Sequence, residues 1–199
     1  MMWILVLLKY ESCGKMIFVT SDTHFNHDKE FLYYPRGFNS IQEHDEKVIE
    51  NWNSIVRPTD EVYHLGDFMM SGDLQYGINC MRQLNGFIYL IVGNHDSKNR
   101  LKEVALLDNV EVIGYGTQLK YNKDRSYFLC HYPTLCASWS REGKINSKVF
   151  SLCGHAHTQN RFVDWPYGGI YHCELDAHNC FPKALDEIHK EINQHLSIF

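Results

Sequence analysis

Five short clusters of metal-binding residue types, each placed where a predicted strand ends, constrain this chain more than any other feature of its sequence. In chain order they are Asp22-Thr23-His24, Gly66-Asp67, Gly93-Asn94-His95-Asp96, His131 and Gly154-His155-Ala156-His157. Each cluster is weak by itself, because a single histidine at a strand end is more often a hydrogen-bonded structural residue than a ligand. Five in succession predict that one rim of an α/β sheet, where such sheets bind ligands, gathers carboxylate, imidazole and amide groups.

The rest of the chain alternates short apolar runs with helical periodicity, which is typical of an α/β protein with sheets packed between helices. Strands are expected at 17–20, 61–65, 87–92, 110–115, 118–121, 127–130, 149–153 and 170–175. Helices are expected at about 41–56, 74–84, 99–107 and 182–195. A length of 199 residues without a visible repeat fits one compact domain, which we place at 16–199.

Residues 1–15 do not fit this pattern. Their apolar run, 3–8, is far shorter than the ~20 residues needed to span a bilayer, and it lacks the basic region and cleavage site of a signal peptide. Met16 opens the first strand, so residues 1–15 are expected to be an N-terminal extension, a start-site artefact or an added edge strand. No membrane contact is expected. Seven cysteines, an odd number without a CxxC pair, favour the reducing cytoplasm.

The ligand chemistry of the clusters favours an open site for divalent cations. Imidazole nitrogens mixed with carboxylate and amide oxygens suit Mn²⁺, Fe²⁺, Zn²⁺ or Ni²⁺, whereas a closed structural zinc site would be rich in cysteine. Residues i and i+2 of an extended segment point the same way, so Asp22 and His24 can act together. The net charge of −5 argues against a broad grip on long nucleic acid. A nucleotide remains compatible, because bound cations would reverse the local field.

In this order, the clusters resemble those of the calcineurin-like metallophosphoesterases. Flanking stretches are similar to a small bacterial and phage-type branch of that family: His24-Phe25-Asn26-His27, Arg36-Gly37-Phe38, Asn51-Trp52-Asn53, Val62-Tyr63-His64-Leu65-Gly66-Asp67 and His131-Tyr132-Pro133. The resemblance extends from Met16 to the C-terminal helix. It implies a four-layer α/β/β/α sandwich in which two mixed sheets are flanked by helices.

The resemblance also implies a site for two divalent cations, with Mn²⁺ as the expected metal. One cation would be held by Asp22, His24, Asp67 and His157. The other would be held by Asp67, Asn94, His131 and His155, so that Asp67 bridges the two. The expected function is hydrolysis of a phosphomonoester or phosphodiester of a small molecule, such as a nucleotide, by a metal-bridging hydroxide. The alternatives are a nuclease acting on RNA or DNA and a catalytically inactive metal-binding scaffold.

Four further residues are candidates for a role in the reaction, His95 and His27 by the resemblance and Asp96 and Arg36 by their own chemistry. His95 would protonate the leaving group or stabilise its charge. Asp96 would orient His95, or would serve the local turn instead. His27 and Arg36 are candidate phosphate contacts, Arg36 through bidentate pairing, with a solvated histidine and a surface arginine as the respective alternatives.

Other side chains near the clusters keep two interpretations. His64 either faces the core or supports a ligand from behind. Tyr132, Trp139 and Arg141 either line a wall that binds a base or pack as ordinary aromatic and surface residues. The remaining histidines match no motif and are expected to be structural or exposed: His172, His178, His189 and His195. The sequence does not predict the oligomeric state.

Overall fold

The computed structural model describes residues 14–70, 72–123, 125–134, 137–139, 145–165 and 168–196. The expectation for the N-terminal extension falls almost wholly outside these residues and stays a prediction, as does the boundary of a single domain at 16–199. The expected role of Arg141 and that of the Trp139 side chain also fall outside the described part.

The first sheet supplies the rim that carries three of the five clusters. Its strands lie in the order β11-β1-β2-β3-β4. Their bounds are Ile17–Thr20 for β1, Glu61–His64 for β2, Phe87–Ile91 for β3, Val110–Gly114 for β4 and Lys183–Ala184 for β11. β1 to β4 are parallel and β11 is antiparallel to β1. The carboxyl ends of the parallel strands therefore meet at one edge.

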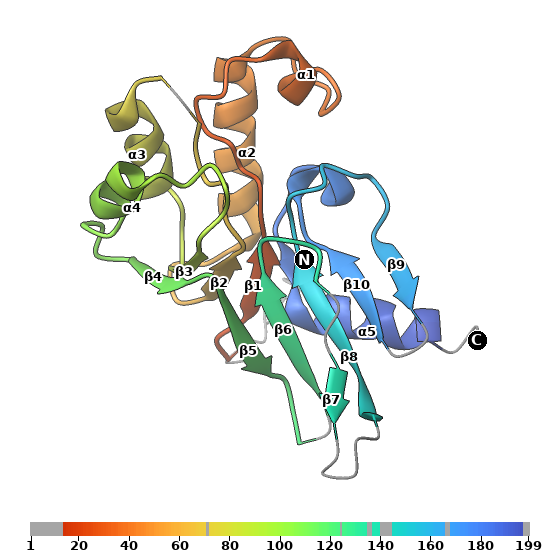
Figure 1. The fold of residues 1–199 in the computed structure, drawn as a ribbon. Helices are drawn as coiled ribbons and strands as arrows, with labels where there is room; N and C mark the ends of the chain where they lie inside the picture. Colours follow the sequence, from red (N-terminus) through yellow and green to blue (C-terminus); the bar gives the residue numbers. More distant parts are fainter. Residues whose placement is uncertain are drawn as a thin grey trace, which may run out of the picture.

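The second sheet carries the other two clusters. Its main order is β5-β6-β8-β10-β9, with β7 paired to β8. The bounds are Gly116–Lys120 for β5, Ser126–Cys130 for β6, Ala137–Trp139 for β7, Ile145–Cys153 for β8, Phe162–Trp165 for β9 and Gly168–His172 for β10. β6, β8 and β10 are parallel to one another. In Figure 1 their carboxyl ends point to the same side as those of the first sheet.

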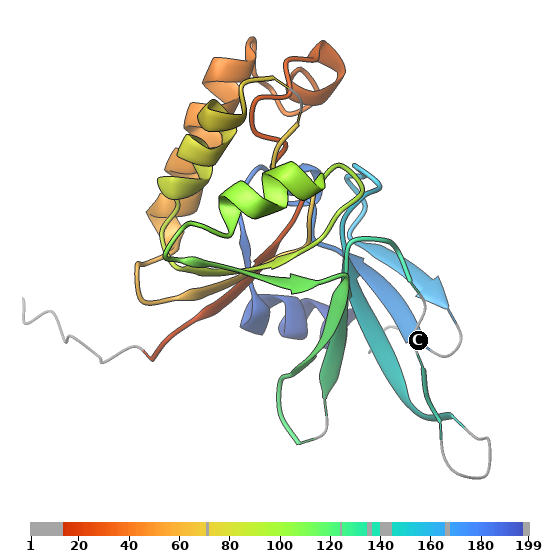
Figure 2. The same cartoon turned by 60° about the vertical axis from the view of Figure 1, so that its left-hand side comes forward.

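Three helices cover the outer face of the first sheet, as Figure 2 shows. They are α2 (Ile41–Ile55), α3 (Leu74–Arg82) and α4 (Lys98–Val104). Each begins where a short polar side chain, Ser40, Asp73 or Ser97, accepts a hydrogen bond from a first-turn amide. Their apolar faces bury residues such as Trp52 and Met81 against the sheet.

The opposite face of the first sheet packs against the second sheet and against helix α5 (Leu185–Leu196). Ile188 and Ile192 of α5 are fully buried in a cluster with side chains from both sheets, including Val19 and Phe150. This inter-sheet core holds the two rims next to each other. None of the described helices combines the length and apolarity that crossing a membrane requires.

The predicted architecture of two mixed sheets flanked by helices is confirmed, with corrections at individual elements. The sequence did not predict β7, β9, β11 or the four-residue helix α1 (Glu30–Tyr33). The last helix begins at Leu185 rather than 182, because Lys183–Ala184 pairs with β1. The strand expected at 170–175 ends at His172, and a 3₁₀ turn, η1 (Leu175–His178), follows it.

Candidate metal centre

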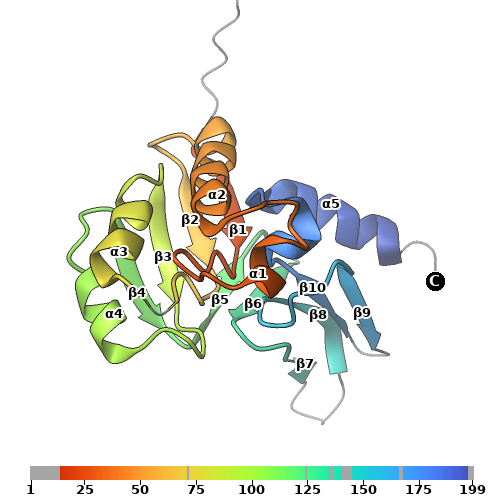
Figure 3. The same cartoon turned by 90° about the horizontal axis from the view of Figure 1, so that it is seen from above.

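The structure brings all seven side chains predicted as ligands to one place on the joined rims. They follow β1, β2, β3, β6 and β8, and Figure 3 looks down on the side at which these strands end. The seven are Asp22, His24, Asp67, Asn94, His131, His155 and His157. Segments up to 133 residues apart in sequence thus come within hydrogen-bond distance.

One group of donor atoms surrounds a single point between the two sheets. His24 Nε2 lies 3.1 Å from His157 Nε2, and Asp22 Oδ1 lies 3.6 Å from each of those nitrogens. Asp67 Oδ2 lies 3.8 Å from His24 Nε2. Nitrogen and carboxylate atoms with their lone pairs converging in this way form a candidate site for one cation.

A second group lies directly beside the first and shares one of its atoms. His131 Nε2 lies 3.4 Å from Asp67 Oδ2 and 2.8 Å from Asn94 Oδ1. His155 Nδ1 lies 2.8 Å from the same Asn94 oxygen and 3.2 Å from His131 Nε2. Asp67 Oδ2 is therefore within 4 Å of a histidine nitrogen from each group, where a carboxylate shared between two cations would have to lie.

A separate observation also supports a divalent cation among these residues. The Asp22 side chain is 0% exposed, and its Oδ1 atom has no hydrogen-bond partner among the described residues. A buried carboxylate oxygen without a partner is costly unless a cation compensates it. Burial alone would raise the pKa of Asp22 and Asp67, but the neighbouring His24 and His131 lower both pKa values below the ordinary range. Two carboxylates thus stay ionised inside the cluster.

The backbone around these residues is strained in a consistent way. Five of the seven are non-glycine residues with positive φ: Asp22 at 58°, His24 at 48°, Asp67 at 56°, His155 at 76° and His157 at 48°. Such left-handed conformations are disfavoured for residues with a Cβ and concentrate at functional sites, where the surrounding structure holds them in place. The strained turns direct side chains from two sheets into one space.

Gly154→Ala tests how closely this space is filled. A Cβ at Gly154 would collide with the Asp22 carboxylate and the Ser21 hydroxyl. We expect a loss of about 1–3 kcal/mol in the free energy of unfolding, as for other overpacked sites, together with weaker cation binding. Denaturant unfolding and metal titration measure the two effects. Gly14→Ala is the control, because nothing lies within 4 Å of its Cβ position. Equal effects of both substitutions would contradict the close approach.

The two residues predicted as catalytic are placed differently from each other. His95 is 40% exposed at its side chain, with Nε2 at 4.0 Å from Asp67 Oδ2, so it lies at the mouth of the cluster. Asp96 is buried, and its carboxylate accepts hydrogen bonds from the backbone amides of Asp67, Phe68 and Gly93. Of the two roles left open for Asp96, this geometry matches support of the turn that carries Asp67.

The two candidate phosphate contacts also differ. His27 lies at the centre, with its ring centroid 5.3 Å from that of His24, and its buried Nδ1 atom has no partner within the described part of the chain. Burial and the neighbouring histidines lower the pKa of His27 to about 4. Arg36 instead lies behind the cluster, where its guanidinium contacts Asp176, His44 and the Asp22 carbonyl oxygen. That geometry favours a positioning role, and direct phosphate contact by either residue stays a prediction.

Of the flanking residues, some lie beside the predicted ligands and others lie away from them. His64 is buried, with Nε2 3.0 Å from Thr23 Oγ1, and its Nδ1 accepts from the Gly66 amide, so it joins the first two clusters from behind. Tyr132 is 49% exposed, and its ring lies 4.9 Å from that of His155. His172, His178 and His189 each have a hydrogen-bond partner away from the cluster, as expected of structural residues.

Sequence reasoning missed Asp176, although it contacts a predicted ligand directly. Its Oδ2 atom lies 3.1 Å from His157 Nδ1 and 2.7 Å from Arg36 Nη2. These partners hold the pKa of Asp176 well below its usual range despite burial, which opposes them. The available signal was its position directly after the strand expected at 170–175, since the other acidic ligands also follow strands. A lone aspartate without a neighbouring histidine motif gave no reason to select it.

Comparison with known proteins places this arrangement in a family. A model described as "Calcineurin-like phosphoesterase" matches residues 15–195. The uncharacterized protein MJ1445 of Methanocaldococcus jannaschii is 38% identical over 116 residues, which are 58% of this chain and 63% of that protein. The Gene 66 protein of Mycobacterium phage L5 is 32% identical over 89 residues, which are 43% of this chain and 42% of that protein. The chain thus matches less than two thirds of either relative.

One solved structure agrees on the fold. A protein of unknown function from Aquifex aeolicus, AQ665, superposes with a TM-score of 0.64 at 21% identity, covering 89% of this chain and 99% of that one. A novel archaeal phosphodiesterase gives a TM-score of 0.44 at 19% identity over 78% of this chain and 81% of that one, which is too distant to add to the case. The fold and the cluster of carboxylate and imidazole side chains agree with that family model. The chain belongs to the calcineurin-like phosphoesterase family.

Proposed function

We propose that this protein hydrolyses a phosphomonoester or phosphodiester of a small molecule with two divalent cations, most readily Mn²⁺. The observation that carries the proposal is the position of Asp67 Oδ2, which lies 3.8 Å from His24 Nε2 and 3.4 Å from His131 Nε2. One cation would lie among Asp22, His24, Asp67 and His157. The other would lie among Asp67, Asn94, His131 and His155.

The cations and the side chains around them would have distinct roles in this reaction. Bound cations supply Lewis acidity at the phosphate and a water of lowered pKa. Asp67 and Asp22 provide the negative charge that retains the cations, and the strained turns fix the direction of their carboxylates. His95 lies at the exposed side of the centre, where a leaving group would depart, and its imidazole would donate a proton to the leaving oxygen.

Two exposed aromatic rings beside the centre support a substrate with a planar leaving group, such as a nucleoside. Phe31 of α1 is 72% exposed and Tyr132 is 49% exposed. The Phe31 ring contacts His27 at 5.5 Å between centroids, and the Tyr132 ring contacts His131 at 5.2 Å. Large apolar rings left open next to a polar centre can stack on a flat ligand. The net charge of −5 disfavours a long nucleic acid.

A substrate panel with the Mn²⁺-loaded protein tests the proposal. The panel holds cyclic nucleotides, nucleoside monophosphates, dinucleoside polyphosphates, aryl esters and short oligonucleotides, each with Mn²⁺, Zn²⁺, Ni²⁺ and a chelator. We expect metal-dependent turnover of at least one small ester and no turnover with the chelator. Faster cleavage of oligonucleotides than of mononucleotide esters would replace this function with that of a nuclease. Turnover of no phosphoester at all would favour a metal-binding scaffold.

Replacing Phe31 or Tyr132 by alanine tests the leaving-group preference. We expect KM for a nucleoside or aryl ester to rise about two- to tenfold, the worth of one aromatic contact. KM for glycerol phosphate, which has no ring, should stay unchanged, and comparison of the two esters measures the effect. Leu106→Ala is the control, since Leu106 is 75% exposed on the segment after α4. An equal rise for both esters would contradict stacking on these rings.

A further inference from the structure

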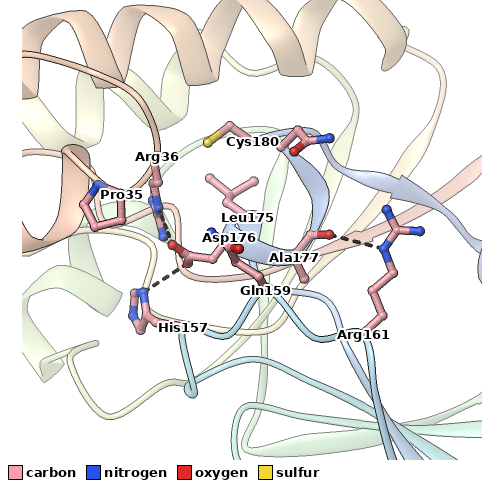
Figure 4. Close-up of a pocket in the computed structure, with 10 residues that line it drawn as sticks. Pro35, Arg36, His157, Gln159, Arg161, Leu175, Asp176, Ala177 and Cys180 are labelled. Atoms are coloured by element: carbon pink, nitrogen blue, oxygen red, sulfur yellow. Dashed lines mark hydrogen bonds and ion pairs between the residues drawn. The ribbon is translucent and has the colours of Figure 1, made fainter.

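A chain of polar contacts runs from the metal centre into the protein interior behind His157. His157 Nδ1 lies 3.1 Å from Asp176 Oδ2. The Asp176 carboxylate in turn accepts two hydrogen bonds from Arg36, at 3.0 Å from Nε and 2.7 Å from Nη2. Figure 4 shows the three side chains together on one wall of a cavity of about 360 Å³.

The chain continues beyond Arg36 into helix α2. Arg36 Nη1 lies 2.9 Å from His44 Nε2, and His44 Nδ1 lies 2.7 Å from Asp45 Oδ1. The Arg36 side chain is 1% exposed, and His44 and Asp45 are buried. A guanidinium is deeply buried only where several acceptors satisfy its donors, and here the carboxylate, the imidazole and the Asp22 carbonyl oxygen do so.

These contacts fix the protons on both histidines. A guanidinium can only donate, so His44 Nε2 must accept and His44 Nδ1 must carry the hydrogen that it gives to Asp45. In the same way, the Asp176 carboxylate, which already accepts from Arg36, takes the Nδ1 hydrogen of His157. The Nε2 lone pair of His157 is then directed at Asp22 and His24, as metal binding requires.

The same chain also holds the backbone of the first cluster. Arg36 Nη2 donates to the carbonyl oxygen of Asp22, a residue with φ of 58°. Asp45 Oδ2 accepts from the amide of Asn26, whose φ is 63°. One buried assembly therefore contacts Asp22, His157 and the loop of His24, which are the residues of the first group and not those of the second.

The second group is oriented by other means. His131 Nδ1 lies 2.9 Å from the carbonyl oxygen of Leu65, a backbone atom. This contact fixes the His131 proton without any side chain of the Arg36 assembly. His131 and His157 thus have separate supports, while Asp22 Oδ2 also accepts from the His155 amide at 3.0 Å.

We propose that Arg36 and Asp176, supported by His44 and Asp45, are positioning residues that set the cation affinity of the first group far more than that of the second. The first group is Asp22, His24, Asp67 and His157. Removing the carboxylate or the guanidinium leaves the His157 tautomer and the Asp22 turn unsupported, while the second group keeps its backbone contact. This inference rests on the proposed two-cation function.

Stepwise titration with Co²⁺, followed by visible absorption, tests the proposal without any turnover. We expect Asp176→Asn to lower the affinity for one of the two bound Co²⁺ ions about 10- to 100-fold, as for other residues that orient a metal-bound histidine. The affinity for the other ion should stay close to that of the parent. His157→Ala and Asn94→Ala mark which equivalent belongs to which group. The Co²⁺ ion that Asp176→Asn binds more weakly must be the same ion that His157→Ala binds more weakly.

Two further variants separate positioning from folding. Arg36→Met/Asp176→Leu removes the buried ion pair as a unit, which is often nearly neutral for stability. The unfolding midpoint of this double variant should therefore recover toward that of the parent. Its affinity for the cation of the first group should stay low. Arg161→Met is the matched control, because Arg161 lines the same cavity and pairs with Glu191 at 3.3 Å. It should leave both equivalents unchanged.

Three results would overturn the proposal: both equivalents weaken equally, neither weakens, or the weakened one is that of Asn94. If the parent protein binds no Co²⁺, the proposed function itself fails. If the parent binds two cations and Asp176→Asn binds them equally well, only the positioning role fails.

Discussion

Asp67→Asn is expected to remove both cations and to lower turnover by about 10³-fold or more, because in the proposed two-metal centre this one carboxylate would serve both cations. Asp67 is 2% exposed. Its Oδ2 faces His24 and His131, while its Oδ1 accepts from the His95 amide at 2.8 Å. Asparagine keeps the size and one acceptor of aspartate, so the substitution mainly removes the shared negative charge.

Metal analysis by mass spectrometry, together with turnover of an aryl phosphate, measures this effect. Asp108→Asn is the control, since Asp108 is an exposed carboxylate in the turn after α4. The shared role of Asp67 would be wrong if the asparagine variant kept two tightly bound cations, or if it kept turnover close to that of the parent.

His95→Ala is expected to lower kcat by about 10²- to 10⁴-fold while both cations stay bound, the usual range for losing a general acid. The side chain is 40% exposed and lies 4.0 Å from Asp67 Oδ2 at the mouth of the centre. The His95 backbone amide, which holds Asp67 Oδ1, is retained in the alanine variant. Loss of the imidazole would therefore remove the proposed proton donor and leave the predicted ligands in place.

Esters with different leaving groups distinguish proton donation from general damage. A nitrophenolate departs without protonation, whereas an alkoxide does not, so the alanine variant should lose far more activity on an alkyl ester. Steady-state kinetics on both esters, with metal content measured in the same samples, gives the comparison. Equal losses on the two esters, or loss of the cations, would refute this role of His95.

The sequence predicted the position of the centre because only the residues that directly follow each strand had to be recognised. Each acidic or histidine cluster follows a parallel strand, and the carboxyl ends of parallel strands meet at one rim. The order of the strands was not needed for that conclusion. Their positions at strand ends thus predicted that Asp22 and His157 lie together, although 135 residues separate them in the chain.

The supports behind the centre could not be predicted, because they depend on contacts between distant segments. Arg36 and Asp176 lie 140 residues apart, and neither stands in a motif that indicates the other. In helix α2 the sequence shows Asp45 only as a polar interruption of an apolar face. Its role becomes visible only in the structure, where Arg36 contacts His44 and His44 contacts Asp45. Short elements were missed for a related reason, since the four residues of α1 are too few to show periodicity.

A crystal structure of the Mn²⁺-loaded protein, with anomalous diffraction to locate the metal, tests the central claim most directly. We expect two separate anomalous peaks that both contact the Asp67 carboxylate, one beside His24 and His157 and the other beside His131 and Asn94. A single peak, or two peaks of which only one contacts Asp67, would contradict that claim.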